Sequence, residues 1–291
     1  MEIFIAQTVN GLAIGSLYAL AIVGINLLLL VRGVMHFSYP HIVVVAMYVF
    51  WMVLEATQIN MFLAVPATII AAIILTVLTE FLFRPLALRK AFLETVIVSL
   101  GIGIILTEIM SHYFNQGLPI SFPTRDMGGG EIITWGMITF SMGHIYTLAG
   151  TIGAAIGLFF FLYRHKQGKA FRAIAQDLDV ALLLGIPFNR TGVYSFAIAG
   201  FLAGVVAIFL ALTLGSASAF LGDTLAIKAM VLILFAGMGN LLGGLICALL
   251  VGLAEALTMA YLPGRWSEAI VFGAIMMVII IKPQGLFGSR T

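Results

Sequence analysis

Nine apolar runs follow one another along the 291-residue chain, with most charged residues in the gaps between them. Most runs are long enough for a helix of about 20 residues that crosses a hydrocarbon core of about 30 Å. They also lack the alternation of a barrel strand, and only helices or closed barrels satisfy their backbone groups in lipid. The runs cover residues 5–31, 38–55, 60–83, 92–114, 142–163, 193–214, 224–238, 240–261 and 266–282.

The pattern predicts an all-α polytopic membrane protein with eight or nine transmembrane helices. The two counts differ in whether the short run 224–238 crosses fully or forms a re-entrant hairpin. At 291 residues we expect one transmembrane domain over residues 1–291, with a charged cytoplasmic loop at 164–192. The first run continues past the length of a signal-peptide core, so we expect a retained span.

Composition excludes a soluble enzyme, since 62% of the residues are hydrophobic and only 9% are charged, against about a quarter charged in soluble domains. The formal net charge of +2 is too small to indicate nucleic-acid binding. The single cysteine, Cys247, lies inside an apolar run, so we expect a buried thiol and no disulfide.

Basic residues predict the orientation, because cytoplasmic loops carry an excess of lysine and arginine. An external N-terminus and a cytoplasmic C-terminus place eleven basic residues inside, Arg125 and Arg265 outside and Lys228 in the membrane. If 224–238 is re-entrant, only ten basic residues are inside and three are outside, so nine crossings are favoured. The eleven are Arg32, Arg84, Arg89, Lys90, Arg164, Lys166, Lys169, Arg172, Arg190, Lys282 and Arg290.

Polar residues inside spans either face a cavity or bond to another helix. We take five of them as candidates for a translocation pathway, with interhelical hydrogen bonding as the alternative. The candidates are Asn10, Ser16, Tyr18, Ser38 and Asn240.

Charged residues in the runs have a different expected role. Glu55, Glu80 and Glu94 lie near span ends and are interpreted as boundary charges, whereas Glu108 and Glu255 lie deeper. Lys228 either extends to the outer surface, which we favour, or pairs with a carboxylate.

Small residues one helical turn apart predict close helix packing, because lipid supplies no hydrophobic force between helices. Such pairs occur at Gly11 and Gly15, Gly153 and Gly157, Gly200 and Gly204, and Gly239 and Gly243.

Two breaks between runs have alternative interpretations. The glycine-rich stretch 235–244 indicates either irregular backbone lining a cavity or a tight turn between two helices. In the outer loop 115–141, residues 131–140 predict a small hairpin or an interfacial loop anchored by Trp135.

The charged loop contains one amphipathic pattern from Ala170 to Leu184, where apolar residues recur at helical spacing. Gly185, followed by Ile186 and Pro187, predicts the end of that helix. The helix either lies on lipid headgroups, with its basic residues attracting anionic lipid, or docks onto a cytoplasmic motor.

Three stretches carry a resemblance that runs from end to end. The first is NGLAIGSLYAL at 10–20, the second GKAFRAIAQD at 168–177 with Leu184, Gly185 and Ile186, and the third AGMGN at 236–240 with the ending KPQGLFG at 282–288. They resemble the permease subunits of branched-chain amino-acid (Liv-type) ABC importers, a family that also includes urea and amide permeases. One segment departs: residues 36–40 read HFSYP where the family usually has N-F-A-H-G, which leaves open a cargo other than leucine, isoleucine or valine.

The resemblance implies a non-catalytic subunit in the cytoplasmic membrane of a bacterium or archaeon. Its partners would be a second, related permease subunit, two cytoplasmic ATPase subunits that bind ATP and Mg²⁺, a periplasmic or extracellular substrate-binding protein, and membrane lipid. The chain itself would hold no cofactor, and it contains no G-x-x-x-x-G-K-[ST] motif.

The resemblance also implies that the helix at 170–185 couples the chain to the ATPase. Polar contacts would come from Arg172, Gln176 and Asp177, and the face buried in the ATPase from Phe171, Ile174 and Ala181, with Gly185 ending the helix. The main alternative is an ion-coupled secondary transporter or channel, which needs intramembrane carboxylates. Aspartate is absent from the interiors of the predicted spans, which disfavours it.

Overall fold

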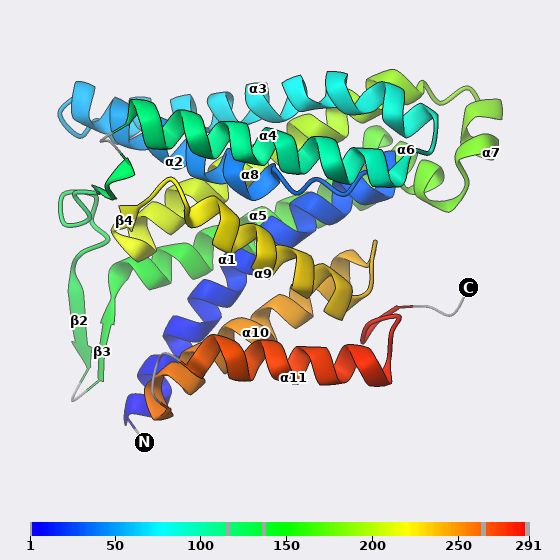
Figure 1. The fold of residues 1–291 in the computed structure, drawn as a ribbon. Helices are drawn as coiled ribbons and strands as arrows, with labels where there is room; N and C mark the ends of the chain where they lie inside the picture. Colours follow the sequence, from blue (N-terminus) through cyan, green and yellow to red (C-terminus); the bar gives the residue numbers. More distant parts are fainter. Residues whose placement is uncertain (1, 115–116, 136–137, 263–265, 289–291) are drawn as a thin grey trace.

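A computed structural model describes residues 2–114, 117–135, 138–262 and 266–288, and most of them are helical (Figure 1). This confirms the predicted all-α polytopic class. Seven helices are long and apolar enough to cross a membrane. They are α1 (Glu2–Arg32), α2 (Tyr39–Ala56), α3 (Met61–Leu88), α4 (Phe92–Tyr113), α5 (Met142–Arg164), α8 (Phe188–Leu214) and α10 (Leu241–Tyr261).

Two shorter apolar helices, α9 (Leu221–Ala236) and α11 (Ser267–Ile281), account for the remaining predicted runs. α9 is one continuous helix, so the re-entrant hairpin is not observed. Two further short helices, α6 (Lys166–Gln176) and α7 (Leu178–Leu183), lie in the charged loop. The number of full crossings stays a prediction.

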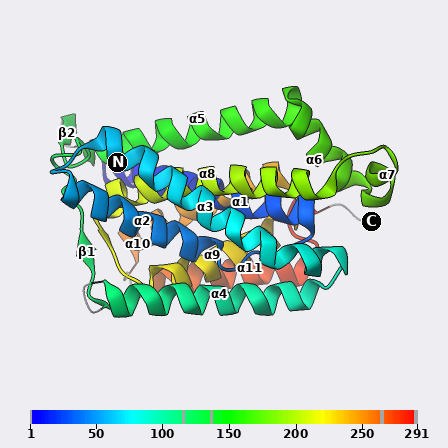
Figure 2. The same cartoon turned by 90° about the horizontal axis from the view of Figure 1, so that it is seen from above.

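The helical bundle has two distinct ends (Figures 1 and 2). α6, α7 and the C-terminal segment lie at one end, here called the basic end, and the strands lie at the other, here called the hairpin end. The predicted cytoplasmic residues that the structure describes are at the basic end. Arg290, also predicted to be cytoplasmic, and Arg265, predicted to be external, both lie outside the described residues. Which end faces the cytoplasm stays a prediction.

At the hairpin end, β2 (Ile132–Trp135) pairs antiparallel with β3 (Ile138–Ser141), which confirms the predicted hairpin. β1 (Ile120–Ser121) pairs with β4 (Ser216–Ala217) and joins the outer loop to the end of α8.

α1 to α4 and α8 to α11 repeat the same order of elements in opposite directions (Figures 1 and 2). α1 is followed by an irregular segment, 33–38, and then by α2; α8 is followed by 215–220 and then by α9. Both segments begin at a glycine in the left-handed region, Gly33 at φ +67° and Gly215 at φ +68°. α1 packs mainly on α10, and α8 packs mainly on α3. The two halves therefore form an inverted repeat.

Glycines allow these pairs of helices to approach closely, as predicted for two of the four small-residue pairs. A Cβ atom at Gly11 would lie 2.8 Å from the Cα of Leu253 on α10, and one at Gly200 would lie 2.7 Å from the Cα of Ile73 on α3. At Gly153 this chain leaves space on α5, so close packing there stays a prediction. Gly157 shares that open side, whereas Gly239 and Gly243 lie at the turn before α10 and in its first turn.

The turn between α9 and α10 agrees with both interpretations of the glycine-rich stretch: it is a tight turn, and its irregular backbone lines a cavity. Gly237 and Gly239 have φ values of +98° and +79°. Asn240 caps α10, because its Oδ1 accepts a hydrogen bond of 2.8 Å from the backbone N–H of Gly243. Cys247 is fully buried on α10, as expected.

Candidate functional site

The charged loop forms two helices rather than the single predicted one. The helical pattern breaks at Asp177, whose extended backbone separates α6 from α7. Its Oδ1 accepts a 3.0 Å hydrogen bond from the backbone N–H of Val180 and so caps α7. The period of 3.6 residues continues across the break, which is why sequence alone merges the two helices. Asp177 is thus a structural cap, besides any contact with a partner.

The predicted buried face of this segment is already covered by the chain itself. Phe171, Ile174 and Ala181 are 2, 6 and 1% exposed. The ring of Phe171 lies 6.1 Å from that of Phe161 on α5. Gly168 has no room for a side chain beside the carbonyl of Phe161, so α6 packs directly on α5. The prediction that these three side chains insert into an ATPase is therefore corrected: they attach the loop to its own bundle.

The end of the segment exposes four apolar side chains. Leu183 is 88% exposed, Leu184 is 74%, Val180 is 50% and Leu182 is 44%. These four residues, which lie in α7 and directly after it, are here called the apolar tip, and α7 projects at the basic end beyond the other helices (Figure 2). The tip ends at Gly185, whose φ of +79° confirms the predicted helix stop.

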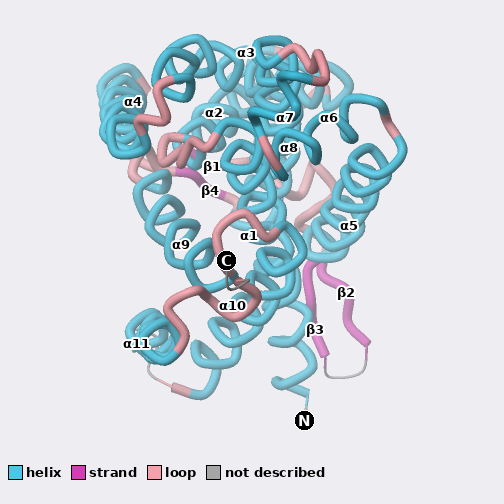
Figure 3. The backbone as a smooth tube through the Cα atoms, turned by 90° about the vertical axis from the view of Figure 1, so that its right-hand side faces the viewer, coloured by secondary structure: helices cyan, strands magenta, loops and turns pink. Residues whose placement is uncertain are grey.

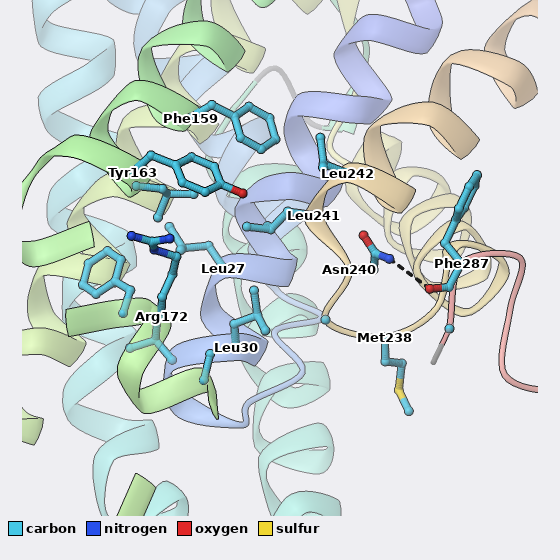
Figure 4. A pocket seen from close by; sticks show the side chains of 16 residues that line it. Leu27, Leu30, Phe159, Tyr163, Arg172, Met238, Asn240, Leu241, Leu242 and Phe287 are labelled. Carbon is cyan, nitrogen blue, oxygen red and sulfur yellow. Dashed lines mark hydrogen bonds between the residues drawn. The ribbon is translucent and has the colours of Figure 1, made fainter. Parts of the chain in front are cut away.

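A cavity of about 400 Å³ lies behind α6 at the basic end (Figure 4). Its walls come from α1, α5 and α6, from the turn before α10, and from residues 287–288. The guanidinium of Arg172 lies 4.7 Å from the centre of the Tyr163 ring, and the Asn240 side chain donates a 2.9 Å hydrogen bond to the carbonyl of Phe287. Arg172 and Gln176 are both exposed and available to a partner.

A buried ion cluster joins three helices close to this loop. Glu80 on α3 is fully buried and pairs with Arg32 at the end of α1, and with Arg84 at 2.6 Å. The Arg32 guanidinium also lies 4.1 Å from the centre of the Phe188 ring at the start of α8. Glu80 is therefore wrongly predicted as a boundary charge. The cluster therefore forms a rigid junction between α1, α3 and α8 at the end of the loop.

The five predicted pathway residues do not form one lining. Ser16 is buried, and its hydroxyl accepts a 2.8 Å hydrogen bond from Thr151 on α5. Ser38 is buried beside His36, and Asn240 lies at the basic end. For Ser16 and Ser38 the structure supports the alternative of packing. Asn240 both caps α10 and lines the cavity at the basic end, so its pathway role stays a prediction.

Asn10 and Tyr18, the other two candidates, both lie on α1. The Oδ1 of Asn10 is buried without a hydrogen-bond partner among the described residues. Tyr18 belongs to the ion cluster around Lys228. A pathway role for either stays a prediction.

The segment that departs from the family pattern is part of the core. His36 is 1% exposed, and its Nε2 lies 2.8 Å from the hydroxyl of Thr79. The hydroxyl of Tyr39 donates a 2.8 Å hydrogen bond to the carbonyl of Ala199. Pro40 is in the first turn of α2, where its fixed φ fits a helix start. These side chains fix the position at which α2 begins, and an effect of the segment on the choice of cargo stays a prediction.

Lys228 adopts the paired arrangement and not the favoured extension to the surface. Its Nζ pairs with Glu255 on α10 and lies 3.1 Å from Glu268 on α11. It also donates a 3.2 Å hydrogen bond to the hydroxyl of Tyr18, which donates one of 3.1 Å to Glu255. The cluster ties α1, α9, α10 and α11 together.

One polar pair in the middle of the bundle escaped sequence reasoning. The Nε2 of His41, in the first turn of α2, lies 3.0 Å from Oδ1 of Asp223, in the first turn of α9. The two residues occupy equivalent places in the inverted repeat. Asp223 immediately precedes the predicted run 224–238, so it was counted outside the membrane. The glycine at 215, where the preceding loop starts, was the sequence signal that could have indicated an earlier start for this helix.

Comparisons with known proteins found relatives along nearly the whole chain. Residues 7–280 match the family described as "Branched-chain amino acid transport system / permease component". The chain belongs to this family. The high-affinity branched-chain amino acid transport system permease protein LivH of Salmonella typhimurium is 28% identical to this chain, over 98% of the chain and 96% of that protein. The permease protein BraD of Pseudomonas aeruginosa is 25% identical, over the same shares of the two chains. The autoinducer 2 import permease LsrD of Escherichia coli O9:H4 is 34% identical, but over 43% of this chain and 40% of its own length.

Proposed function

We propose that this chain is a non-catalytic, membrane-spanning subunit of an ATP-driven importer, with its basic end in the cytoplasm. Family membership over residues 7–280 supports this proposal. The importer would contain a second permease subunit, two ATPase subunits and an external substrate-binding protein. The cargo would be a branched-chain amino acid or a related small polar solute.

The observation that carries the coupling proposal is the apolar tip. Water-exposed leucines at the end of a charged loop are costly unless a partner covers them. A groove on the ATPase would bury Leu183 and Leu184, each contributing about 1.5–3 kcal/mol. The buried residues Phe171 and Ile174 would then pass movement of the tip to α5, and the Arg32 junction would pass it to α1, α3 and α8.

The test uses the assembled transporter in proteoliposomes, with ATP-dependent uptake of radiolabelled leucine and co-purification of the ATPase as measurements. The double substitution Leu183→Gln with Leu184→Gln is expected to lower both at least tenfold, given about 1.4 kcal/mol for each factor of ten. Leu88→Gln is a matched control, because Leu88 is an equally apolar residue at the basic end and 59% exposed.

Two results would contradict the proposal. One is wild-type ATPase binding and uptake in the tip variant. The other is leucine movement by this chain alone, down a gradient and without any ATPase, which would favour a channel or secondary transporter. Substitution of Asp177 is less informative, because it also removes the cap of α7.

A further inference from the structure

One side of α9 is left uncovered by this chain, although it lies between α4 and α11 (Figure 3). Phe220, Ile227 and Met230 are 56, 60 and 41% exposed, and the side chain of Asp223 is 52% exposed. Thr224 is exposed beside them. These five residues recur at helical spacing and are here called the open face of α9.

The carboxylate on this face lies near the middle of the helical bundle, measured along its length. At a rise of 1.5 Å per residue, His41 is roughly 22 Å from the end of α2 at Ala56, and Asp223 roughly 20 Å from the end of α9 at Ala236. Those two helix ends lie at opposite ends of the bundle (Figure 1). The inverted repeat gives the same result, since His41 and Asp223 occupy equivalent positions and touch each other.

Lipid is a poor cover for the open face. A half-exposed carboxylate at this depth is stable only against water, a cation or a polar partner. The N-terminus of α9 attracts the negative charge, but Oδ2 of Asp223 has no hydrogen-bond partner among the side chains that the structure describes. The carboxylate is therefore held by one oxygen and available through the other.

His41 is built into the fold to hold that carboxylate. Its side chain is 5% exposed. A Cβ atom at Gly103 on α4 would lie 2.9 Å from its ring, and one at Gly222 on α9 would lie 2.8 Å from it. An ionised carboxylate only accepts hydrogen bonds, so Nε2 of His41 is the donor. The two glycines make room for the ring, and the ring fixes the position of Asp223.

We infer that Asp223 contacts the substrate: it accepts a hydrogen bond from the ammonium group of the amino acid, in an aqueous pathway between the open face of α9 and the second permease subunit. His41 is the positioning residue. The inference rests on the proposed function, because it needs that second subunit and an amino-acid cargo. An ammonium group has three donors and no acceptor, which matches the free carboxylate oxygen.

The first experiment measures ATP-dependent leucine uptake by the assembled transporter. Asp223→Asn keeps the shape and the bond to His41 but removes the charge, and we expect the rate of uptake to fall about tenfold or more. Asp126→Asn, the same change at an exposed site in the outer loop, is the control and should transport normally.

The test of His41 must distinguish a role in positioning Asp223 from a role in helix packing. His41→Leu is expected to reduce uptake, and His41→Gln, which restores a donor, to recover part of it. Wild-type uptake by Asp223→Asn, beside an active control, would overturn the inference and leave the proposed function intact.

The second experiment tests water access without requiring transport. Thr224→Cys, in a chain with Cys247→Ala, is treated with a cationic methanethiosulfonate reagent. Ile152→Cys, in the middle of α5 and 53% exposed at the native residue, is the control. We expect at least tenfold faster labelling at position 224 and protection by leucine with the binding protein. Equally slow labelling at both positions would overturn the inference, whereas failure of the wild-type transporter to use ATP would count against the proposed function.

Discussion

Gly192→Ala tests the buried junction that joins α1, α3 and α8. Gly192 lies in the second turn of α8, and a methyl group there would overlap the guanidinium of Arg32. The guanidinium contacts Glu80 and the ring of Phe188, and we expect the shift that the methyl group forces to weaken its pair with Glu80. The substitution thus weakens an ion pair without touching either charged residue.

The expected cost follows from the partners that remain. Removing one member of a buried pair costs about 3–5 kcal/mol, and overpacking a core costs about 1–3 kcal/mol. Glu80 keeps Arg84 at 2.6 Å, so its charge is not left alone. We therefore expect Gly192→Ala to lower the free energy of unfolding by about 2–4 kcal/mol.

Unfolding by sodium dodecyl sulfate in mixed micelles measures this change. Gly153→Ala is the matched control, because it makes the same substitution in a helix with free space around the new methyl group. Alanine should there be neutral, or stabilising by up to about 1 kcal/mol. The cost of Gly192→Ala should also shrink when Glu80→Gln is already present, with a coupling of about 0.5–3 kcal/mol. Wild-type stability, or full additivity with Glu80→Gln, would refute the reasoning.

Three further substitutions test other contacts by the same unfolding assay or by transport. Lys228→Met leaves the buried Glu255 without its main partner and should cost about 3–5 kcal/mol, most of it regained when Glu255→Gln is added; additive losses would contradict this. Gly24→Ala overlaps the hydroxyl of Tyr39 and should cost about 1–3 kcal/mol, less when combined with Tyr39→Phe; an equal cost in both backgrounds would be inconsistent. Gly168→Ala pushes α6 from α5 and should reduce leucine uptake severalfold while the ATPase still co-purifies; unchanged uptake would show that this packing does not transmit movement.

The parts of the fold that the sequence predicted are those that lipid dictates. Backbone groups in hydrocarbon must be satisfied within each segment, so every apolar run became a helix. Small residues on the first run indicated its close packing, which is on α10. Gly185 indicated the end of the amphipathic stretch in the charged loop. These signals are local, and each depends on a few neighbouring residues.

The features that the sequence did not predict depend on contacts between residues far apart in the chain. Glu80 and Arg32 are 48 residues apart, and the pattern around Glu80 matches that of a surface charge near a span end. The amphipathic period at 170–184 predicted a buried side but not whether the chain or a partner covers it. Asp223 was missed because hydropathy marks where a run is apolar, whereas α9 begins three residues before the run 224–238, at Leu221.

The position of α1 also has a consequence for how the protein is made. α1 is made before its main neighbour, α10, and the side chain of Asn26 bonds to backbone 214 residues later. At a translation rate of about 5–20 residues per second, that partner emerges roughly 10–40 s afterwards. During this interval the polar side of the nascent helix must be sheltered by insertion factors or by transient neighbours. Chains that stop before α10 would keep that side unpaired and become substrates for membrane proteases.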